Sequence, residues 1–264
     1  MYLREIWVYP VKSLGGISLS HAAVTLRGLQ HDRRWLITDP DGMFMTQRRT
    51  PRMTLLQPEI LPDRLLISHR HHDIPPLEVP FVPEDNTPVE VKIWNDTVTA
   101  SRVGAWADAW LTEQLQTPCQ LVYMSDECLR PVDPRYAIGA DHVSFADGYP
   151  FLILGQAALD QLNARMDAPV PINRFRPNFV FSGGEPHAED TWREFRIGGH
   201  PFVGVKPCVR CEVPAIDQET GVSGKEPLRT LATYRNIDHK IFFGMNLLTP
   251  MPGTVAVGDK IEIG

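Results

Sequence analysis

The sequence predicts a mainly β protein of the α+β class, with an N-terminal β region followed by a β-barrel that carries a few peripheral helices. Most apolar residues lie in short runs that alternate with polar residues. Turns rich in proline and glycine separate these runs, a pattern typical of strands joined by hairpins. Only a few segments show helical spacing. Since many short strands would leave unpaired edges in an open sheet, we expect a closed barrel or a folded sheet.

The N-terminal region is predicted to be mostly β. The strongest hairpin signal is the turn Asp39-Pro40-Asp41-Gly42, which separates two apolar runs. A second predicted hairpin turns at Asn95-Asp96, and residues 10–16 form a glycine-containing loop. We expect strands at residues 3–8, 17–26, 34–38, 43–46, 55–57, 65–68, 77–79, 89–94 and 97–100.

The spacing of the apolar residues changes after the last of these strands. Apolar residues recur at helical spacing from Gly104 to Gln116, and Pro118 lies beyond the end of this predicted helix. Residues 120–124 are a candidate strand, and residues 131–150 form a long irregular segment of a kind that often binds ligands. We place a domain boundary near Pro118, which gives an N-terminal domain of residues 1–118 and a C-terminal domain of residues 119–264.

The C-terminal half mixes strands and helices. Helical spacing predicts helices over residues 156–166 and 228–234. Alternation predicts strands over residues 178–181, 195–197, 202–205 and, around Gly258-Asp259, two strands within 254–263.

The charge balance excludes several classes of partner. The chain has 264 residues, with 26 lysines and arginines, 32 acidic residues and a net charge of -6. A general attraction to nucleic acid or to an anionic membrane is therefore not expected. No apolar run approaches the roughly 20 residues of a membrane span, and no secretory leader opens the sequence. We expect a cytoplasmic protein with reduced thiols.

Two cysteines, Cys208 and Cys211, stand three positions apart with Arg210 between them. Nearby cations favour thiolates, which attack, exchange electrons or hold soft metals. A lone pair of this spacing fits half of a zinc site, a redox pair or two unrelated core cysteines. The redox interpretation is weakened because residues 212–217 alternate like a strand, where a thioredoxin-like pair would precede a helix.

A zinc site would need two further ligands. The sequence offers no second pair of cysteines at this spacing. Its one histidine cluster is expected in a solvated hairpin and consists of His69, His71 and His72.

Basic residues in two loops are candidates for binding an anion. Lys12 and Ser13 lie in the first loop, and Arg33 enters a predicted strand. Together they suit a phosphate, with arginine as a fork and lysine as a point charge. Spacing alone favours the plainer interpretation that Arg33 pairs with Asp32 or with solvent.

A dense group of donors precedes the predicted strand at residues 178–181. Two arginines and two amides, within Asn173-Arg174-Phe175-Arg176-Pro177-Asn178, suit an anionic ligand that accepts hydrogen bonds. The alternative is a charged loop in which Arg174 pairs with Asp167 or Glu185.

Taken in order, the motifs resemble the MOSC family, and within it the amidoxime-reducing components and their bacterial counterparts. The resemblance extends from near residue 1 to residue 264. The motifs that carry it are Tyr9 to Ser13, Asp32 to Ile37, Pro150 to Leu154, Arg174 to Asn178, Glu189 to Trp192, Pro207 to Cys211, Asp217, Thr220-Gly221 and the helix from Pro227 to Arg235.

The resemblance implies a molybdenum cofactor, in which a pyranopterin dithiolene holds the metal and one protein cysteine is a ligand. Cys211 matches the family's metal ligand, and Cys208 is expected to be a packed neighbour. The other positions implied to contact the cofactor are Lys12, Ser13 and Arg33 at the phosphate, Arg176, Asn178 and Arg210 around the pterin and metal, and the loop at Asp147-Gly148.

The implied reaction is reductive removal of oxygen from N-hydroxylated amidines, hydroxylamines and bases. The residues expected to take part in catalysis are Cys211, Arg210 and Asp147, and Asp147 and His142 are candidates for handling protons. An alternative from another class is a cofactor carrier or sulfur-transfer module without reductase activity. A zinc or dithiol protein without molybdenum is disfavoured by the full set of motifs.

Electrons are expected from a separate donor protein. Some bacterial members of the family continue into a ferredoxin domain, whose cluster needs four cysteines, and animal members carry a membrane anchor. Neither is found in this sequence. The expected partners are a flavoprotein, flavodoxin, ferredoxin or cytochrome b5 type of donor and a small N-hydroxylated substrate, with no nucleic acid and no membrane.

Overall fold

The largest sheet closes into a barrel. The computed structural model describes residues 1–83 and 85–264. In spatial order the strands of this sheet are β19 (Ile261–Ile263), β14 (Glu194–Ile197), β15 (His200–Val209), β17 (Lys240–Leu248), β12 (Phe151–Gly155), β13 (Phe179–Ser182), β1 (Tyr2–Val8) and β2 (Ile17–Leu19), with β16 (Asn236–Ile237) paired to β17. It closes where Tyr2 of β1, the strand beside the end strand β2, bridges Lys260, next to β19. The expected closure of a barrel is thus present.

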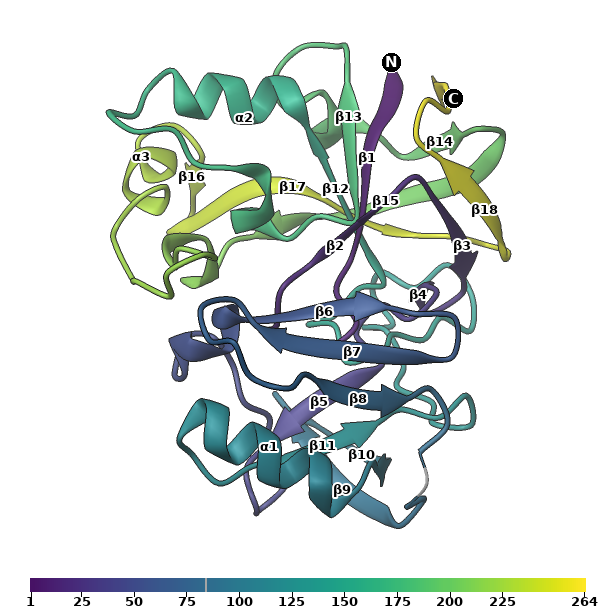
Figure 1. The fold of residues 1–264 in the computed structure, drawn as a ribbon. Helices are drawn as coiled ribbons and strands as arrows, with labels where there is room; N and C mark the ends of the chain where they lie inside the picture. The colour runs from purple at the N-terminus through teal and green to yellow at the C-terminus, as the bar shows by residue number, and fades with distance from the viewer. Residues whose placement is uncertain (84) are drawn as a thin grey trace.

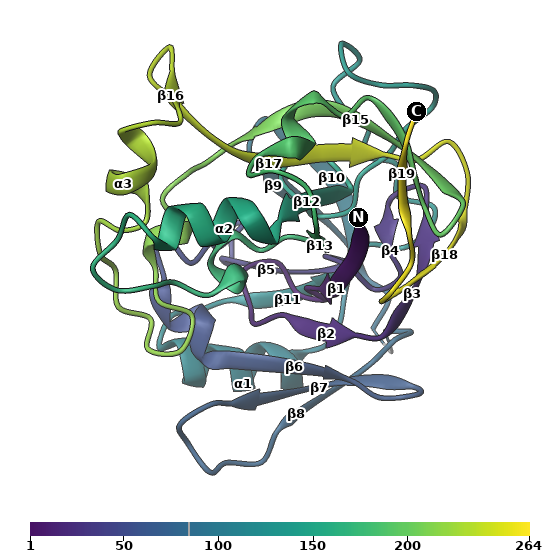
Figure 2. The ribbon, with the colours of Figure 1, turned by 90° about the horizontal axis from the view of Figure 1, so that it is seen from above.

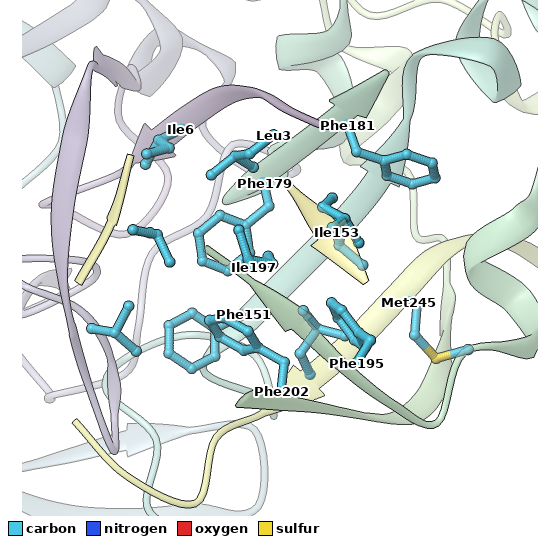
Figure 3. Packing of buried hydrophobic residues seen from close by; sticks show 14 of the residues in the cluster. Leu3, Ile6, Phe151, Ile153, Phe179, Phe181, Phe195, Ile197, Phe202 and Met245 are labelled. Atoms are coloured by element: carbon cyan, nitrogen blue, oxygen red, sulfur yellow. The ribbon is translucent and has the colours of Figure 1, made fainter. Parts of the chain in front are cut away.

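Aromatic side chains fill the barrel (Figure 3). The Phe179 ring lies 5.7 Å from the ring of Phe151 and 5.3 Å from that of Phe202, between ring centroids. In β1, Leu3 and Ile6 are buried, while the exposed Arg4 and the half-buried Glu5 lie between them. Burying each such large side chain stabilises the fold by roughly 1.5–3 kcal/mol.

Three smaller sheets complete the fold. The first holds β5 (Trp35–Thr38), β11 (Gln120–Tyr123), β10 (Asp96–Arg102) and β9 (Pro88–Ile93). The second holds β6 (Leu56–Ile60), β7 (Arg64–His69) and β8 (Leu77–Pro80), and the third β18 (Gly253–Ala256), β3 (His21–Thr25) and β4 (Gly28–Leu29). Figure 1 shows β5 to β11 in its lower half and the barrel strands with both termini in its upper half.

Helices are few and lie on the outside of the fold, as Figure 1 and Figure 2 show together. The α-helices are α1 (Ala105–Leu115), α2 (Gln156–Asn163) and α3 (Leu228–Ala232). Helix α2 joins the parallel strands β12 and β13, which need a crossover connection. The 3-10 helices are η1 (Pro51–Leu55), η2 (Ile172–Phe175), η3 (Ala188–Thr191) and η4 (Val213–Ala215). The mainly β, α+β class predicted from the sequence is confirmed.

Several predicted elements need correction. The strand expected over residues 17–26 divides at Ser20 into β2, which pairs with β1, and β3, which pairs with β18. The strand expected over residues 43–46 is reduced to single bridges at Met43 and Phe44. The helix expected to Met166 ends at Asn163, and the strand-like residues 212–217 contain the 3-10 helix η4.

The longest unpredicted strand is β17. It lies between β15 and β12 and is buried along much of its length, so its sequence lacks the alternation of a half-exposed strand. Gly244, within this strand, has a positive φ of 86°. In the sequence, a glycine in the middle of an apolar run weakens the prediction of a strand.

Hydrogen bonding crosses the expected domain boundary in both directions. Strand β1 pairs with β13 in the barrel, and β11 pairs with β5 and β10 of the N-terminal sheet. The division into residues 1–118 and 119–264 therefore stays a prediction, and the two parts share strands. Across residues 1–83 and 85–264, no helix combines the length and apolar character that crossing a membrane requires.

Candidate active site

One cleft collects all nine residues predicted to form the site. It lies where loops from both halves of the chain meet. Its lining consists of Lys12, Ser13, Arg33, Thr46, Gln47, Arg48, Ala146, Asp147, Gly148, Tyr149, Phe151, Leu152, Phe175, Arg176, Asn178, Cys208, Val209, Arg210, Cys211, Val213 and Asn246. His142, the further candidate for handling protons, is half-buried and is not among the lining residues.

Lys12 and Asp147 form an ion pair inside this cleft. The Lys12 Nζ donates to Asp147 Oδ1 at 2.5 Å and to the carbonyl oxygen of Phe145 at 2.8 Å. Burial lowers the pKa of Lys12, and the Asp147 carboxylate opposes this shift. Desolvation raises the pKa of Asp147, but the Lys12 ammonium and a hydrogen bond from Trp94 Nε1 outweigh it and leave this pKa well below its usual range. Asp147 is therefore a carboxylate at neutral pH.

Arg33 is held by a buried carboxylate. Its Nη1 lies 2.6 Å from Oδ2 of Asp32, whose side chain is fully buried. The guanidinium carbon also lies 4.4 Å from the centre of the Tyr9 ring. The pairing of Arg33 with Asp32 that spacing favoured is present, and Arg33 lines the cleft as well, so the two interpretations are compatible.

Arg176 shares the same tyrosine and retains a free donor. Its guanidinium carbon lies 4.2 Å from the centre of the Tyr9 ring, and its Nη1 donates to the carbonyl oxygen of Leu14 at 2.7 Å. Its buried Nη2 has no hydrogen-bond partner within residues 1–83 and 85–264. Burial lowers the pKa of Arg176 to about 10, so it remains a cation at neutral pH.

Backbone strain gathers at the same place. Ser13, Arg33 and Arg176 have positive φ values of 70°, 49° and 54°. For residues other than glycine this conformation costs about 1–2 kcal/mol each. Three strained residues at one cleft indicate that side-chain placement there is fixed at the expense of stability.

The two cysteines are unequal. Cys211 is exposed, whereas Cys208 is half-buried and accepts a hydrogen bond from Arg210 Nη1 at 3.1 Å. Burial raises the pKa of the Cys208 thiol, and Arg210 opposes that shift. Arg210 Nη2 donates to the carbonyl oxygen of Phe175 at 2.7 Å, and its buried Nε has no partner in the described part of the chain.

Asn178 is engaged within the protein. Its Oδ1 accepts from the backbone N–H of Leu152 at 3.2 Å and from Arg33 Nη1 at 3.3 Å. Its Nδ2 donates to the carbonyl oxygen of Trp7 at 3.2 Å. Although Asn178 lines the cleft, its bonds chiefly fix Arg33 and the start of β12.

The second predicted donor cluster needs a correction. Arg174 pairs with Asp217 at 2.9 Å, and not with Asp167 or Glu185. Its Nε also donates to the carbonyl oxygen of Pro214 at 2.8 Å, so it ties η2 to η4. The pairing joins loops separated by 43 positions, which sequence proximity does not indicate.

Sequence reasoning missed three residues that shape the cleft. Gln47 donates to the carbonyl oxygen of Ser13 at 2.8 Å and exchanges hydrogen bonds with Gln218, each 3.1 Å long. Arg48 adds a cation to the lining. Arg130 is buried and donates to the carbonyl oxygens of Ser144, Ala146 and Asp147, which fixes the loop that carries Asp147. The basic run at residues 48–49 was the one available signal.

The cleft suits a polyanion and a soft metal. Five cations line it, namely Lys12, Arg33, Arg48, Arg176 and Arg210, against the single carboxylate of Asp147. The unpartnered donors on Arg176 and Arg210 are buried, and leaving them unsatisfied costs roughly 1–3 kcal/mol each. A phosphate-bearing cofactor would supply acceptors for them. The exposed thiol of Cys211 at the same cleft is a ligand type that soft transition metals prefer.

Comparisons with known proteins agree with this chemistry. Residues 1–118 match the MOSC N-terminal beta barrel domain, and residues 140–262 match the MOSC domain. Mitochondrial amidoxime-reducing component 1 of Homo sapiens is 34% identical over 280 residues, which cover 99% of this chain and 82% of that protein. The Mus musculus protein of the same name is 33% identical, over the same 99% of this chain and 82% of that protein. Molybdenum cofactor sulfurase of Arabidopsis thaliana is 31% identical over 92% of this chain and 32% of that protein.

Proposed function

Since the chain belongs to the MOSC family, we propose that it binds a molybdenum cofactor in the cationic cleft and uses it to remove oxygen from N-hydroxylated compounds. The observation that carries the proposal is the convergence of four cations and one exposed thiol, from the segments predicted to hold this cofactor, on a single cleft. The names of the relatives support a function related to the molybdenum cofactor. The reductase reaction and its substrates go beyond those names, and we propose them from the family resemblance.

Each group of residues has a distinct task in this proposal. Lys12, Ser13 and Arg33 would hold the cofactor phosphate, and Arg176 and Arg210 would donate to the pterin and to groups near the metal through their unpartnered nitrogens. Cys211 would be the metal ligand. When bound, the cofactor supplies the two-electron redox chemistry that no side chain of the protein provides.

Three further residues position the cofactor-binding side chains and do not themselves react. Asp147 remains ionised, so it does not release a proton at neutral pH, and its bonds position Lys12 and the indole of Trp94. Cys208 receives a hydrogen bond from Arg210 and orients it. Asn178, with both polar atoms of its side chain engaged, positions Arg33 beside the proposed phosphate site.

The electrons would come from a separate donor protein of the flavoprotein, flavodoxin, ferredoxin or cytochrome b5 type. A cytoplasmic location is part of the same proposal. Both follow from the family resemblance and the composition. Assays with purified candidate donors test the first, and cell fractionation tests the second.

The alternative is a carrier or sulfur-transfer module that binds the cofactor without reductase activity. The observation in its favour is the match to a molybdenum cofactor sulfurase over 32% of that protein. Both functions would use the same cation-lined cleft, so cofactor content does not distinguish them.

Turnover distinguishes the two functions. Protein expressed in a host that makes the cofactor is supplied with a chemical electron donor and benzamidoxime or 6-hydroxylaminopurine, and the amine product is measured. We expect multiple turnovers per molybdenum, with loss of activity in Cys211→Ser. A fully metal-loaded protein that yields no amine from either substrate would refute the reductase and leave the carrier.

A further inference from the structure

Arg48 is a cation of the cleft that the proposed cofactor site does not use. It lines the cleft together with Asp147 and Arg210 but was not among the residues matched to the cofactor. It forms no ion pair and no side-chain hydrogen bond within residues 1–83 and 85–264. A half-buried guanidinium at a cleft has all its N–H donors available to a ligand.

The backbone of Arg48 is fixed on both sides. The preceding Gln47 is fully buried and bonds to the carbonyl oxygen of Ser13 and to Gln218. On the other side, the backbone N–H groups of Arg49 and Thr50 donate to the carbonyl oxygen of Thr46 at 3.1 and 2.9 Å, which closes a turn around Arg48. The side chain therefore projects from a rigid segment.

The side chain is held as well. The guanidinium carbon of Arg48 lies 4.5 Å from the centre of the Trp94 ring. Trp94 is itself anchored by the bond from its Nε1 to Asp147 Oδ1 at 3.2 Å and by Phe44, whose ring centroid lies 4.9 Å away. This cation–π contact holds the guanidinium without using a hydrogen-bond acceptor, so its N–H donors remain available to a ligand.

The charges around Arg48 leave it uncompensated. The carboxylate that lines the same cleft, Asp147, is paired with Lys12 at 2.5 Å. The remaining charged residues of the lining are the cations Arg33, Arg176 and Arg210. Since these three cations are assigned to the cofactor, Arg48 is the one left to attract an anionic group of the substrate, and a planar carboxylate matches the two parallel donors of arginine.

We propose that Arg48 is a specificity-determining residue that binds a carboxylate on the substrate, so that the preferred substrates are N-hydroxylated compounds bearing an anionic group. The proposal rests on the proposed function for the identity of the reacting group. The cation–π contact of Arg48 with Trp94 sets the side of the cleft on which that carboxylate is placed.

The kinetic test uses two amidoximes of the same shape, 4-carboxybenzamidoxime and the neutral 4-carbamoylbenzamidoxime. We expect Arg48→Ala to lower kcat/KM for the carboxylate about fivefold, through KM, and to leave the neutral compound within about twofold. Arg48→Lys should retain part of the preference because it keeps the charge but loses the planar fork. The preference of the native protein should shrink as salt is raised.

Arg49→Ala is the matched control. Arg49 is the neighbouring arginine, is exposed and does not line the cleft, so its removal changes the net charge equally and should leave the preference intact. Equal losses for both amidoximes in Arg48→Ala, or the same loss in Arg49→Ala, would overturn the proposal. A fall in molybdenum content in Arg48→Ala would assign Arg48 to the cofactor and would also overturn it.

A binding measurement separates this proposal from the reductase function. Calorimetry with 4-carbamoylbenzoate and its neutral counterpart terephthalamide uses ligands that cannot be reduced in this way. We expect the native metal-loaded protein to bind the anion about fivefold more tightly than the neutral compound. Arg48→Ala should bind the two compounds equally. If neither amidoxime is turned over, the reductase proposal fails while this measurement still decides the role of Arg48. Equal binding of both compounds by the native protein would refute the anion site.

Discussion

Individual side chains in the cleft are proposed to bind the cofactor, and their strained backbones lower the stability of the fold. Arg33 and Arg176 approach the ring of the same Tyr9 within 4.4 and 4.2 Å, and both have strained backbones. The two guanidinium groups repel each other, since Arg33 helps to lower the pKa of Arg176, and a nearby anion offsets this repulsion. The buried Asp32 supplies one such anion for Arg33, and we expect the cofactor phosphate to supply another.

Replacing Arg33 tests this arrangement. Arg33→Ala should weaken cofactor binding roughly ten- to hundredfold, the value of a charge-assisted hydrogen bond to phosphate. Molybdenum per chain after expression and dilution reports the loss. The change also leaves Asp32 buried and unpaired, which by itself destabilises the protein. The double variant Asp32→Asn, Arg33→Ala removes that effect, and full molybdenum occupancy in both variants would contradict the phosphate assignment.

A second buried acid lies away from the cleft, in η3. Glu189 is fully buried, and its Oε1 accepts from the backbone N–H of Gly155 at 3.1 Å. Its Oε2 has no hydrogen-bond partner among the described residues. Burial raises the pKa of Glu189 from its ordinary 4.5 to about 7, with Asp190 adding to the shift and the two backbone hydrogen bonds and Arg235 opposing it. The protonated form is therefore the one that the fold accommodates.

This pKa predicts how stability changes with pH. The folded protein holds the proton of Glu189 more tightly than the unfolded chain, so its contribution is fully present below about pH 4.5 and is lost as pH rises to about 7. The loss is about 3 kcal/mol at most. Glu189→Gln should therefore match the native protein near pH 4.5 and be the more stable at pH 8, in urea unfolding. Exposed Glu194→Gln is the control, and parallel stability curves for Glu189→Gln and the native protein would contradict the assignment.

Single elements show why local patterns succeed or fail. The hairpin of β9 and β10 was predicted because its residues alternate, although its turn falls at Trp94-Asn95, one position before the one expected. Trp94 takes a positive φ of 56° there, which brings its indole to Asp147. Strand β17 was missed because both of its faces are covered and Gly244 breaks its pattern.

Gly244 tests the account of β17. A Cβ at this position would lie 2.9 Å from the carbonyl oxygen of Ile153 in the paired strand β12, and φ is 86°. Gly244→Ala should cost about 2 kcal/mol and lower Tm by about 5 °C. Gly139, whose Cβ would meet nothing within 4 Å, is the control, and Gly139→Ala should leave Tm within about 1 °C. An unchanged Tm in Gly244→Ala would show that β17 tolerates an ordinary residue there.

The whole molecule determines what the sequence alone cannot predict. Alternation and turn chemistry predict most strands, but the pairing of β1 with β13 and of β11 with β5 depends on segments far apart in the chain. The nine residues predicted for the site came from an ordered set of motifs that resembles a family, and the structure brings them to one cleft. Gln47, Arg48 and Arg130 were not found, because their importance depends on which loops meet. Arg174 was assigned the wrong partner for the same reason.

The molybdenum content of cysteine variants shows whether Cys211 holds the metal. Protein from a cofactor-making host is analysed for metal after Cys211→Ser and, separately, after Cys208→Ser. We expect Cys211→Ser to lose most of its molybdenum, because the exposed thiol would be the metal ligand, and Cys208→Ser to keep it. Stoichiometric molybdenum in Cys211→Ser with loss in Cys208→Ser would contradict the ligand assignment. A native protein that holds zinc and no molybdenum would contradict the proposed cofactor itself.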